Sequence, residues 1–154
     1  MMAASKKTEM FLQAYEDAVL AVQNVLNAAE SMGLGGVVLG SIQNEPAKII
    51  KALNLPKHTF PALGLQIGVP DQEPQLKPRL PLDKIYFENE YHDIDPDSLK
   101  EYDQIVNTYY DLRDANRRID TFTDQVNGKK LSGDPSIRDQ IAPALHAQGL
   151  CLDL

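Results

Sequence analysis

The sequence contains a single cysteine, Cys151, among its 154 residues, so neither an internal disulfide nor a CxxC motif is possible. This cysteine content fits a reducing compartment, and we expect a cytoplasmic protein. No apolar run approaches the roughly 18–20 residues that span a bilayer, and the first residues lack the apolar stretch of a secretory signal. We therefore expect a soluble protein with no membrane partner.

Positive charge is also scarce, since 15 Lys and Arg residues stand against 22 Asp and Glu residues, for a formal net charge of -7. Such a balance provides no general field that would attract nucleic acid, so any anion site has to be local. The three histidines, His58, His92 and His146, are too scattered to indicate a zinc site. No serine lies in a GxSxG motif, and the acidic residues between 88 and 97 lack the EF-hand pattern. The sequence thus predicts no catalytic side chain and no metal site.

The remaining composition is that of an ordinary globular domain, with 43% hydrophobic and 24% charged residues. Apolar residues at steps of three and four predict a long helix over residues 8–32, ended by Gly33. Its two apolar stripes predict burial on two sides, either in a core or against a partner chain. The run Val37–Leu39 predicts a buried strand, and Phe60–Val69 is a candidate for a second strand. We expect an α+β fold, with this long central helix, a small sheet and flanking helices.

Proline and capping residues divide the rest of the chain into shorter elements. Asn44 is expected to cap a short helix that has Pro46 in its first turn, and Asp95 is expected to cap another that begins at Pro96. The other expected elements are an irregular strap over 69–82, a short edge strand over 85–87, a helix over about 119–126 and a last helix from 134–135, bent at Pro143.

The corner formed by Leu39, Gly40 and Ser41 is the first candidate site. It follows a strand, where open α/β sheets usually bind ligands. Because Gly40 has no side chain, a flat ring could approach the backbone amides closely. The alternative is that Gly40 is an ordinary turn residue.

Local positive charge provides the other candidates. Pro78 fixes its own φ and restricts Lys77, so Lys77 and Arg79 are held on a stiff segment that would suit a phosphate. Arg117 and Arg118 could bind an anion in the same way. For both pairs the alternative is ordinary surface charge, near a helix end for Arg117 and Arg118.

At these same places the sequence resembles the flavin-dependent nitroreductase family, and most closely its NADPH-dependent, oxygen-insensitive nitroreductases and flavin reductases. Three runs in the family's order carry the resemblance: Ala28–Gly40, Leu55–Pro70 and Leu76–Pro81. It covers about residues 12–124 of one partial domain, residues 1–154, with a helical tail over 125–154. The family's upstream Arg-Ser-x-Arg pattern does not occur in this sequence. The resemblance therefore implies a partial nitroreductase-like fold whose N-terminal half is absent.

The resemblance implies a homodimer that binds FMN, accepts hydride from NADPH or NADH, and reduces a nitroaromatic, a quinone or free flavin in a ping-pong reaction. No side chain would act as a nucleophile, because the flavin carries the redox chemistry. The alternative hypothesis is a truncated, non-catalytic remnant that serves only as a dimerisation or ligand-binding module. The cofactor-binding residues that the resemblance implies are Leu39, Gly40 and Ser41 beside the flavin ring, Lys77 and Arg79 at the FMN phosphate, and Arg117 and Arg118 at the nicotinamide dinucleotide.

Overall fold

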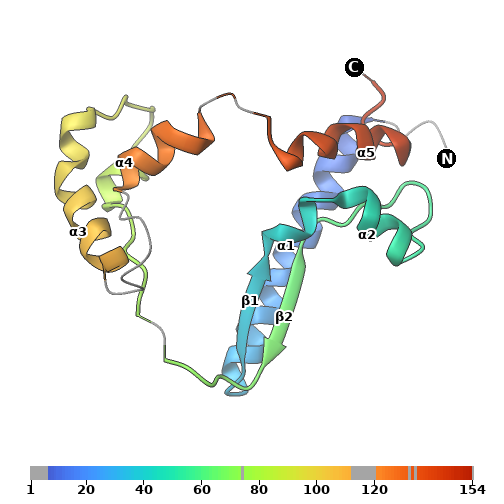
Figure 1. Cartoon of the computed structure of the whole chain (residues 1–154), viewed down its shortest axis with the longest axis horizontal. Helices are drawn as coiled ribbons and strands as arrows, with labels where there is room; N and C mark the ends of the chain where they lie inside the picture. The colour runs from blue at the N-terminus through green and yellow to red at the C-terminus, as the bar shows by residue number, and fades with distance from the viewer. Residues whose placement is uncertain (1–6, 74, 112–120, 132, 134, 154) are drawn as a thin grey trace. The chain divides into compact units, whose positions relative to one another are not determined.

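The structure is a computed structural model that describes residues 7–73, 75–111, 121–131, 133 and 135–153. Contacts divide the chain into two compact units, one of residues 1–73 with 135–154 and the other of residues 74–134. That residues 1–154 form one domain stays a prediction. The helices are α1 (Thr8–Ser31), α2 (Pro46–Ala52), α3 (Lys100–Asp111), α4 (Phe122–Gln125) and α5 (Ile141–Ala147), and the strands are β1 (Gly35–Leu39) and β2 (Gly64–Gly68), as labelled in Figure 1. The α+β class is confirmed.

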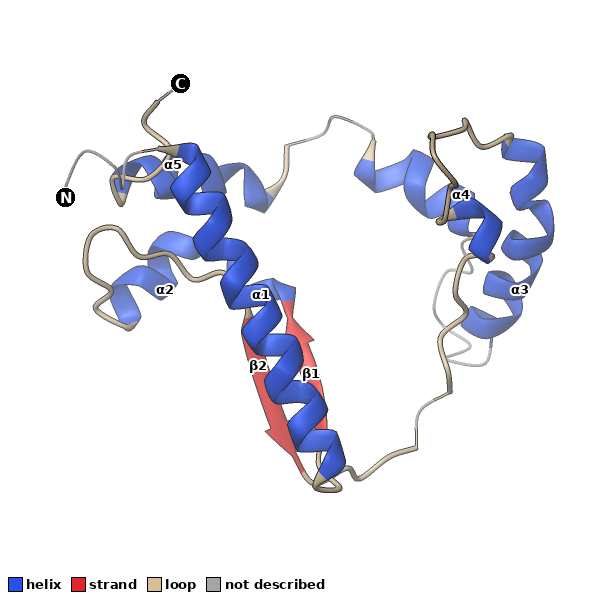
Figure 2. Ribbon diagram, turned by 180° about the vertical axis from the view of Figure 1, so that it is seen from behind, coloured by secondary structure: helices blue, strands red, loops and turns tan. Residues whose placement is uncertain are grey.

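The long helix α1 lies over one face of a two-stranded antiparallel sheet formed by β1 and β2 (Figure 2). It ends as the sequence predicts, because Gly33 adopts a φ of 76° that a residue with a side chain rarely takes. In the sheet, Gly35 pairs with Gly68. A Cβ at Gly36 would collide with Cδ1 of Leu26, so this glycine allows α1 and β1 to approach closely.

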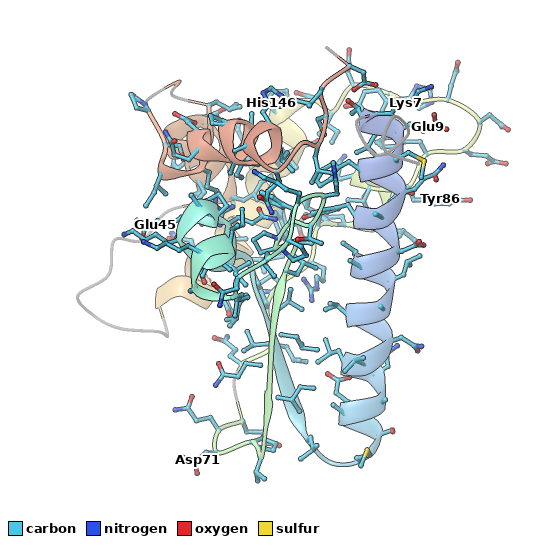
Figure 3. All side chains as sticks on the ribbon, turned by 90° about the vertical axis from the view of Figure 1, so that its right-hand side faces the viewer. Lys7, Glu9, Glu45, Asp71, Tyr86 and His146 are labelled. Carbon is cyan, nitrogen blue, oxygen red and sulfur yellow. The ribbon has the colours of Figure 1, made fainter. Side chains whose placement is uncertain are left out.

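The apolar residues of α1 fall into a stripe that the described residues cover and a stripe that is exposed, and both predicted stripes contain residues of each kind. Figure 3 shows side chains of α1 pointing both toward the strands and away from them. The prediction of burial on two sides is therefore not met within the described chain, because the sheet lies on one side of α1 only. The covered stripe consists of Phe11, Tyr15, Ala18, Val22, Leu26 and Ala29. The exposed stripe, called the alanine stripe below, consists of Met10, Ala14, Ala21, Val25, Ala28 and Met32.

Four local predictions are wrong, or hold only in part. β1 is a strand but is not buried, since Val37 is 50% exposed and no further strand flanks it among the described residues. Asn44 does not cap α2, because the cap position falls on Glu45, which makes no capping bond through its side chain. Residues 85–87 form no strand but follow a short 3-10 turn, since no neighbouring strand in the described chain is there to pair with them. The last helical segment begins with a 3-10 turn capped by Ser136.

Other local predictions are confirmed. The predicted strap over 69–82 contains no regular structure up to Pro81 where it is described, and a 3-10 turn begins at Leu82. The side chain of Asp95 accepts a hydrogen bond from the backbone N–H of Asp97 at 3.0 Å, and Pro96 occupies the first turn of the 3-10 segment before α3. No helix in the described part of the chain is long and apolar enough to cross a membrane.

Each unit has its own small core. In the first unit, Leu145, Leu150 and Cys151 are buried together, and Phe11 and Phe60 pack against them. In the second unit, α3 buries aromatic and β-branched residues at helical spacing. These residues are Tyr102, Val106 and Tyr109.

Candidate functional site

The corner of Leu39, Gly40 and Ser41 lies where β1 passes into a 3-10 turn over Gly40–Gln43. A Cβ built on Gly40 would have one described neighbour within 4 Å, Nη2 of Arg138 at 3.7 Å. Ser41 is exposed, while Leu39 and Gly40 are half-buried. On the side where a Cβ would stand, the nearest described group is thus the Arg138 guanidinium, so a flat ring that approached the backbone of Gly40 there would lie beside this cation.

Arg138 is a feature of this corner that the sequence analysis missed. Its Nη2 donates a hydrogen bond to the carbonyl of Gly40 at 3.2 Å, and its Nε donates to Oδ1 of Asn44 at 3.1 Å. Ser136 and Asp139 form a capping box around Arg138, and this box holds the turn from which the guanidinium extends. The Ser-x-x-Asp spacing is a signal that could have located this turn in the sequence. The contact itself joins residues 98 positions apart, and no local pattern indicates it.

The turn after the corner is held by a second polar contact. The side-chain amide of Gln43 donates to the carbonyl of Ala62 at 2.7 Å and to the hydroxyl of Tyr15 at 3.1 Å. These bonds join the turn to α1 and to the segment that enters β2. The corner is therefore supported on both sides by side chains that other elements place.

Lys77 and Arg79 both line one cavity of about 370 Å³ in the second unit. Tyr102 and Phe122 form part of its aromatic wall, and Pro78 lies between the two cations. Lys77 and Arg79 are exposed, so their charged groups can meet a ligand from solvent. Two cations and several aromatic rings on one cavity suit a ligand that is both anionic and aromatic.

The structure describes part of the predicted set of cofactor-binding residues. Leu39, Gly40 and Ser41 lie together in the first unit, whereas Lys77 and Arg79 lie together in the second. Arg117 and Arg118 lie outside the described residues. Among the residues that are described, no three His, Cys, Asp or Glu side chains gather in a way that could hold a metal ion.

Comparison with protein families finds two matches that together span nearly the whole chain. Residues 1–69 match the description "Nitroreductase family", and residues 77–153 match "Nitroreductase family, C-terminal domain". The matches extend past residues 12–124, to which the sequence motifs alone point, and include most of the last thirty residues.

Curated relatives give a consistent result. The chain is 40% identical over 143 residues to an NADPH-flavin oxidoreductase of Vibrio harveyi, an alignment that covers 93% of this chain and 58% of the relative. It is 40% identical over 141 residues to an oxygen-insensitive NADPH nitroreductase of Salmonella typhimurium, covering 92% of this chain and 58% of that protein. This chain thus spans 58% of the length of these two relatives.

Solved structures with the same fold include the NADPH:FMN oxidoreductase of Vibrio harveyi complexed with NAD+. Its TM-score is 0.82 at 37% identity, covering 95% of this chain and 58% of that one. Nitroreductase A of Vibrio parahaemolyticus gives a TM-score of 0.83 at 39% identity, with the same coverage of 95% and 58%. The nitroreductase-like fold predicted from the motifs is therefore confirmed.

Proposed function

This chain belongs to the nitroreductase family. From that premise we propose that it functions as an FMN-dependent oxidoreductase. In the proposed reaction NADPH is the hydride donor, and a nitroaromatic, a quinone or free flavin is the acceptor. The similarity to an NADPH-flavin oxidoreductase and to an NADPH nitroreductase supports the choice of NADPH and flavin. When bound, FMN supplies the hydride-transfer chemistry, so the protein has to bind and orient the reactants and needs no nucleophilic side chain.

The observation that carries the proposal is the pair of cations on one cavity. Lys77 and Arg79 lie on either side of a proline and line the same space. We assign them to the phosphate of FMN, because a planar guanidinium and an ammonium together match a phosphate dianion. Arg117 and Arg118 keep their proposed place at the nicotinamide dinucleotide.

The corner of Leu39, Gly40 and Ser41 in the first unit carries a separate assignment. We assign Leu39, Gly40 and Ser41 to the flavin ring, because Gly40 has no side chain and, among the described residues, a Cβ there would have only Nη2 of Arg138 within 4 Å, at 3.7 Å. Backbone N–H groups at this corner would face the ring, and Arg138 would add positive charge beside it. Fixed donors and positive charge of this kind stabilise negative charge that develops on a bound group.

We also propose a homodimer that uses the alanine stripe of α1. Its small residues, such as Ala14, Ala21 and Ala28, would let another helix approach closely, and Met32 is 76% exposed in the single chain. Covering this stripe would remove an apolar surface from water.

Titration of the purified chain with FMN, followed by anaerobic addition of NADPH, tests the proposal. We expect the chain to retain yellow FMN after free flavin has been removed by gel filtration, and NADPH to bleach the absorbance of the retained flavin. Lys77→Ala/Arg79→Ala should weaken FMN binding roughly 100-fold or more, since charge-assisted hydrogen bonds contribute about 1.5–3 kcal/mol each. The control Lys51→Ala/Lys100→Ala removes the same charge from two exposed surface positions and should leave the affinity unchanged.

Two results would contradict the proposal in different ways. A chain that retains no FMN after gel filtration, even from saturating FMN, would favour the non-catalytic remnant. A chain that binds FMN, but whose flavin absorbance does not change when NADPH is added, would be a flavin-binding module and not a reductase.

A further inference from the structure

Tyr102 of α3 joins the basic segment, defined here as residues 77–79, to the body of the second unit. Its hydroxyl donates a hydrogen bond to the carbonyl of Pro78 at 3.2 Å, across 24 positions of sequence. The residue is only 7% exposed, although the proline-rich strap around Pro78 has no regular structure. A buried tyrosine usually directs its hydroxyl to a partner, and here that partner is the carbonyl between the two cations.

The ring of Tyr102 is itself held in place by α4. It packs edge-on against Phe122, with ring centroids 5.4 Å apart. The neighbouring residue on α3, Asp103, accepts hydrogen bonds from the backbone N–H and the hydroxyl of Thr123, at 3.0 and 2.6 Å. Because α3 and α4 are joined at two adjacent positions, the Tyr102 hydroxyl is a fixed point and not a mobile surface group.

The hydrogen bond acts on a part of the basic segment that proline leaves free. The Pro78 ring fixes the φ of Pro78 and restricts Lys77, but it does not fix the peptide plane that leads to Arg79. The carbonyl of Pro78 and the backbone nitrogen and Cα of Arg79 share that plane. A donor bound to this carbonyl therefore sets the direction in which the chain enters Arg79.

From this geometry we propose that Tyr102 is a positioning residue, which holds Arg79 beside Lys77 so that the two cations bind one phosphate monoester together. This inference rests on the proposed function, because it takes the FMN phosphate as the ligand of the basic segment. Tyr102 makes no contact with the phosphate itself in this proposal. It acts through the Pro78 carbonyl.

Tyr102→Phe is the appropriate variant, because it removes the hydroxyl and keeps the ring against Phe122. Tyr86→Phe is the matched control, since Tyr86 is 67% exposed in the same unit. Affinities for FMN and for riboflavin, which lacks the phosphate, should be measured side by side in the full chain. We expect Tyr102→Phe to weaken FMN binding about two- to ten-fold, as loss of one neutral hydrogen bond does, and to leave riboflavin binding unchanged.

A second measurement needs no ligand. Trypsin can cut after Arg79, whereas Pro78 blocks cleavage after Lys77, so the rate of this cut reports how firmly the segment is held. We expect Tyr102→Phe to accelerate cleavage at Arg79 several-fold over the wild-type chain, and Tyr86→Phe to leave it unchanged. The Tyr102→Phe change should also add no further loss of FMN affinity when Lys77 and Arg79 are already alanine.

Each alternative result has a defined meaning. Unchanged FMN affinity and cleavage in Tyr102→Phe, with weakened binding in Lys77→Ala/Arg79→Ala, overturns the positioning role and leaves the proposed function standing. Equal weakening of FMN and riboflavin binding also overturns it, because the effect would then be a general structural one. If the wild-type chain binds FMN no more tightly than riboflavin, the assignment of the basic segment to phosphate fails, and this inference fails with it.

Discussion

Replacing Gln148 with methionine is expected to loosen the attachment of the 56–60 loop to the C-terminal part of the first unit. Gln148 is 5% exposed, and its side-chain amide donates hydrogen bonds of 2.9 Å to the carbonyls of Pro56 and Thr59. In addition, the backbone carbonyl of Gln148 accepts from the N–H of His58 at 2.9 Å. The variant keeps the length of the side chain and this backbone bond, and it removes both side-chain donors.

The loss of folding stability depends on which hydrogen bonds the carbonyls of Pro56 and Thr59 keep in the variant. The Pro56 carbonyl retains a bond from the Thr59 hydroxyl at 2.6 Å. Thr59 is exposed, so water can reach its carbonyl once the amide is gone. Neither group is left isolated, and the net loss is therefore about 1 kcal/mol for each hydrogen bond, or about 2 kcal/mol together. For a chain of this length that loss lowers the melting temperature by roughly 4–8 °C.

Thermal and urea unfolding, followed by circular dichroism, measure this loss. Gln148→Glu should destabilise more than Gln148→Met, because a carboxylate would face two carbonyl oxygens in a buried position. Gln13→Met, on the exposed face of α1, is the control and should change the melting temperature by little. If Gln148→Met melts within about 1 °C of the wild type, or if Gln148→Glu is the milder change, the argument that these two bonds hold the loop is wrong.

Two further predictions concern the ends and the outer face of α1. Ala21→Asp on the alanine stripe should convert the proposed dimer to a monomer in light scattering, because it would place an unpaired charge in the buried interface. The control Asn24→Asp, on the polar face of α1, should leave the dimer intact. Equal masses for both variants would refute the proposed interface. The hydroxyl of Thr8, and then its backbone N–H, donate to the Asp153 carboxylate and hold the pKa of Asp153 below its ordinary value of 3.8. Because the folded pKa is lowered, this contact stabilises the fold above the unfolded pKa, and the contribution is lost as the pH falls through the folded pKa. Thr8→Val should raise the pKa of Asp153 toward its ordinary value in an NMR titration, and an unchanged titration would show that the hydroxyl contributes nothing.

The local elements of this protein were readable in the sequence where one stretch of chain carries the whole signal. The period of α1 and the glycine that ends it both lie within about 25 residues, and the structure places them as predicted. The Asp95-Pro96 cap is equally local. The candidate site was found through motifs in the same way, and its assignment to a cofactor stays a prediction.

The errors arose where a property depends on residues far away in sequence. The apolar run of β1 indicates a strand, but whether that strand is buried depends on what covers it, and Val37 is 50% exposed. Asn44 is a good capping residue, yet its side chain instead accepts a hydrogen bond from Arg138, 94 positions later. Residues 85–87 have the composition of a strand but no partner strand among the described residues.

By itself, then, the sequence determined the extent of α1, the presence of the two strands, the Asp95-Pro96 cap, most of the irregular strap and the resemblance to the family, because periodicity, caps, prolines and motifs are properties of neighbouring residues. Only the tertiary structure decided that Arg138 lies beside Gly40, that Tyr102 holds Pro78 and that one stripe of α1 is left open. Those contacts depend on how elements pack in space, and the free energy that selects them comes from groups separated by tens of residues along the chain.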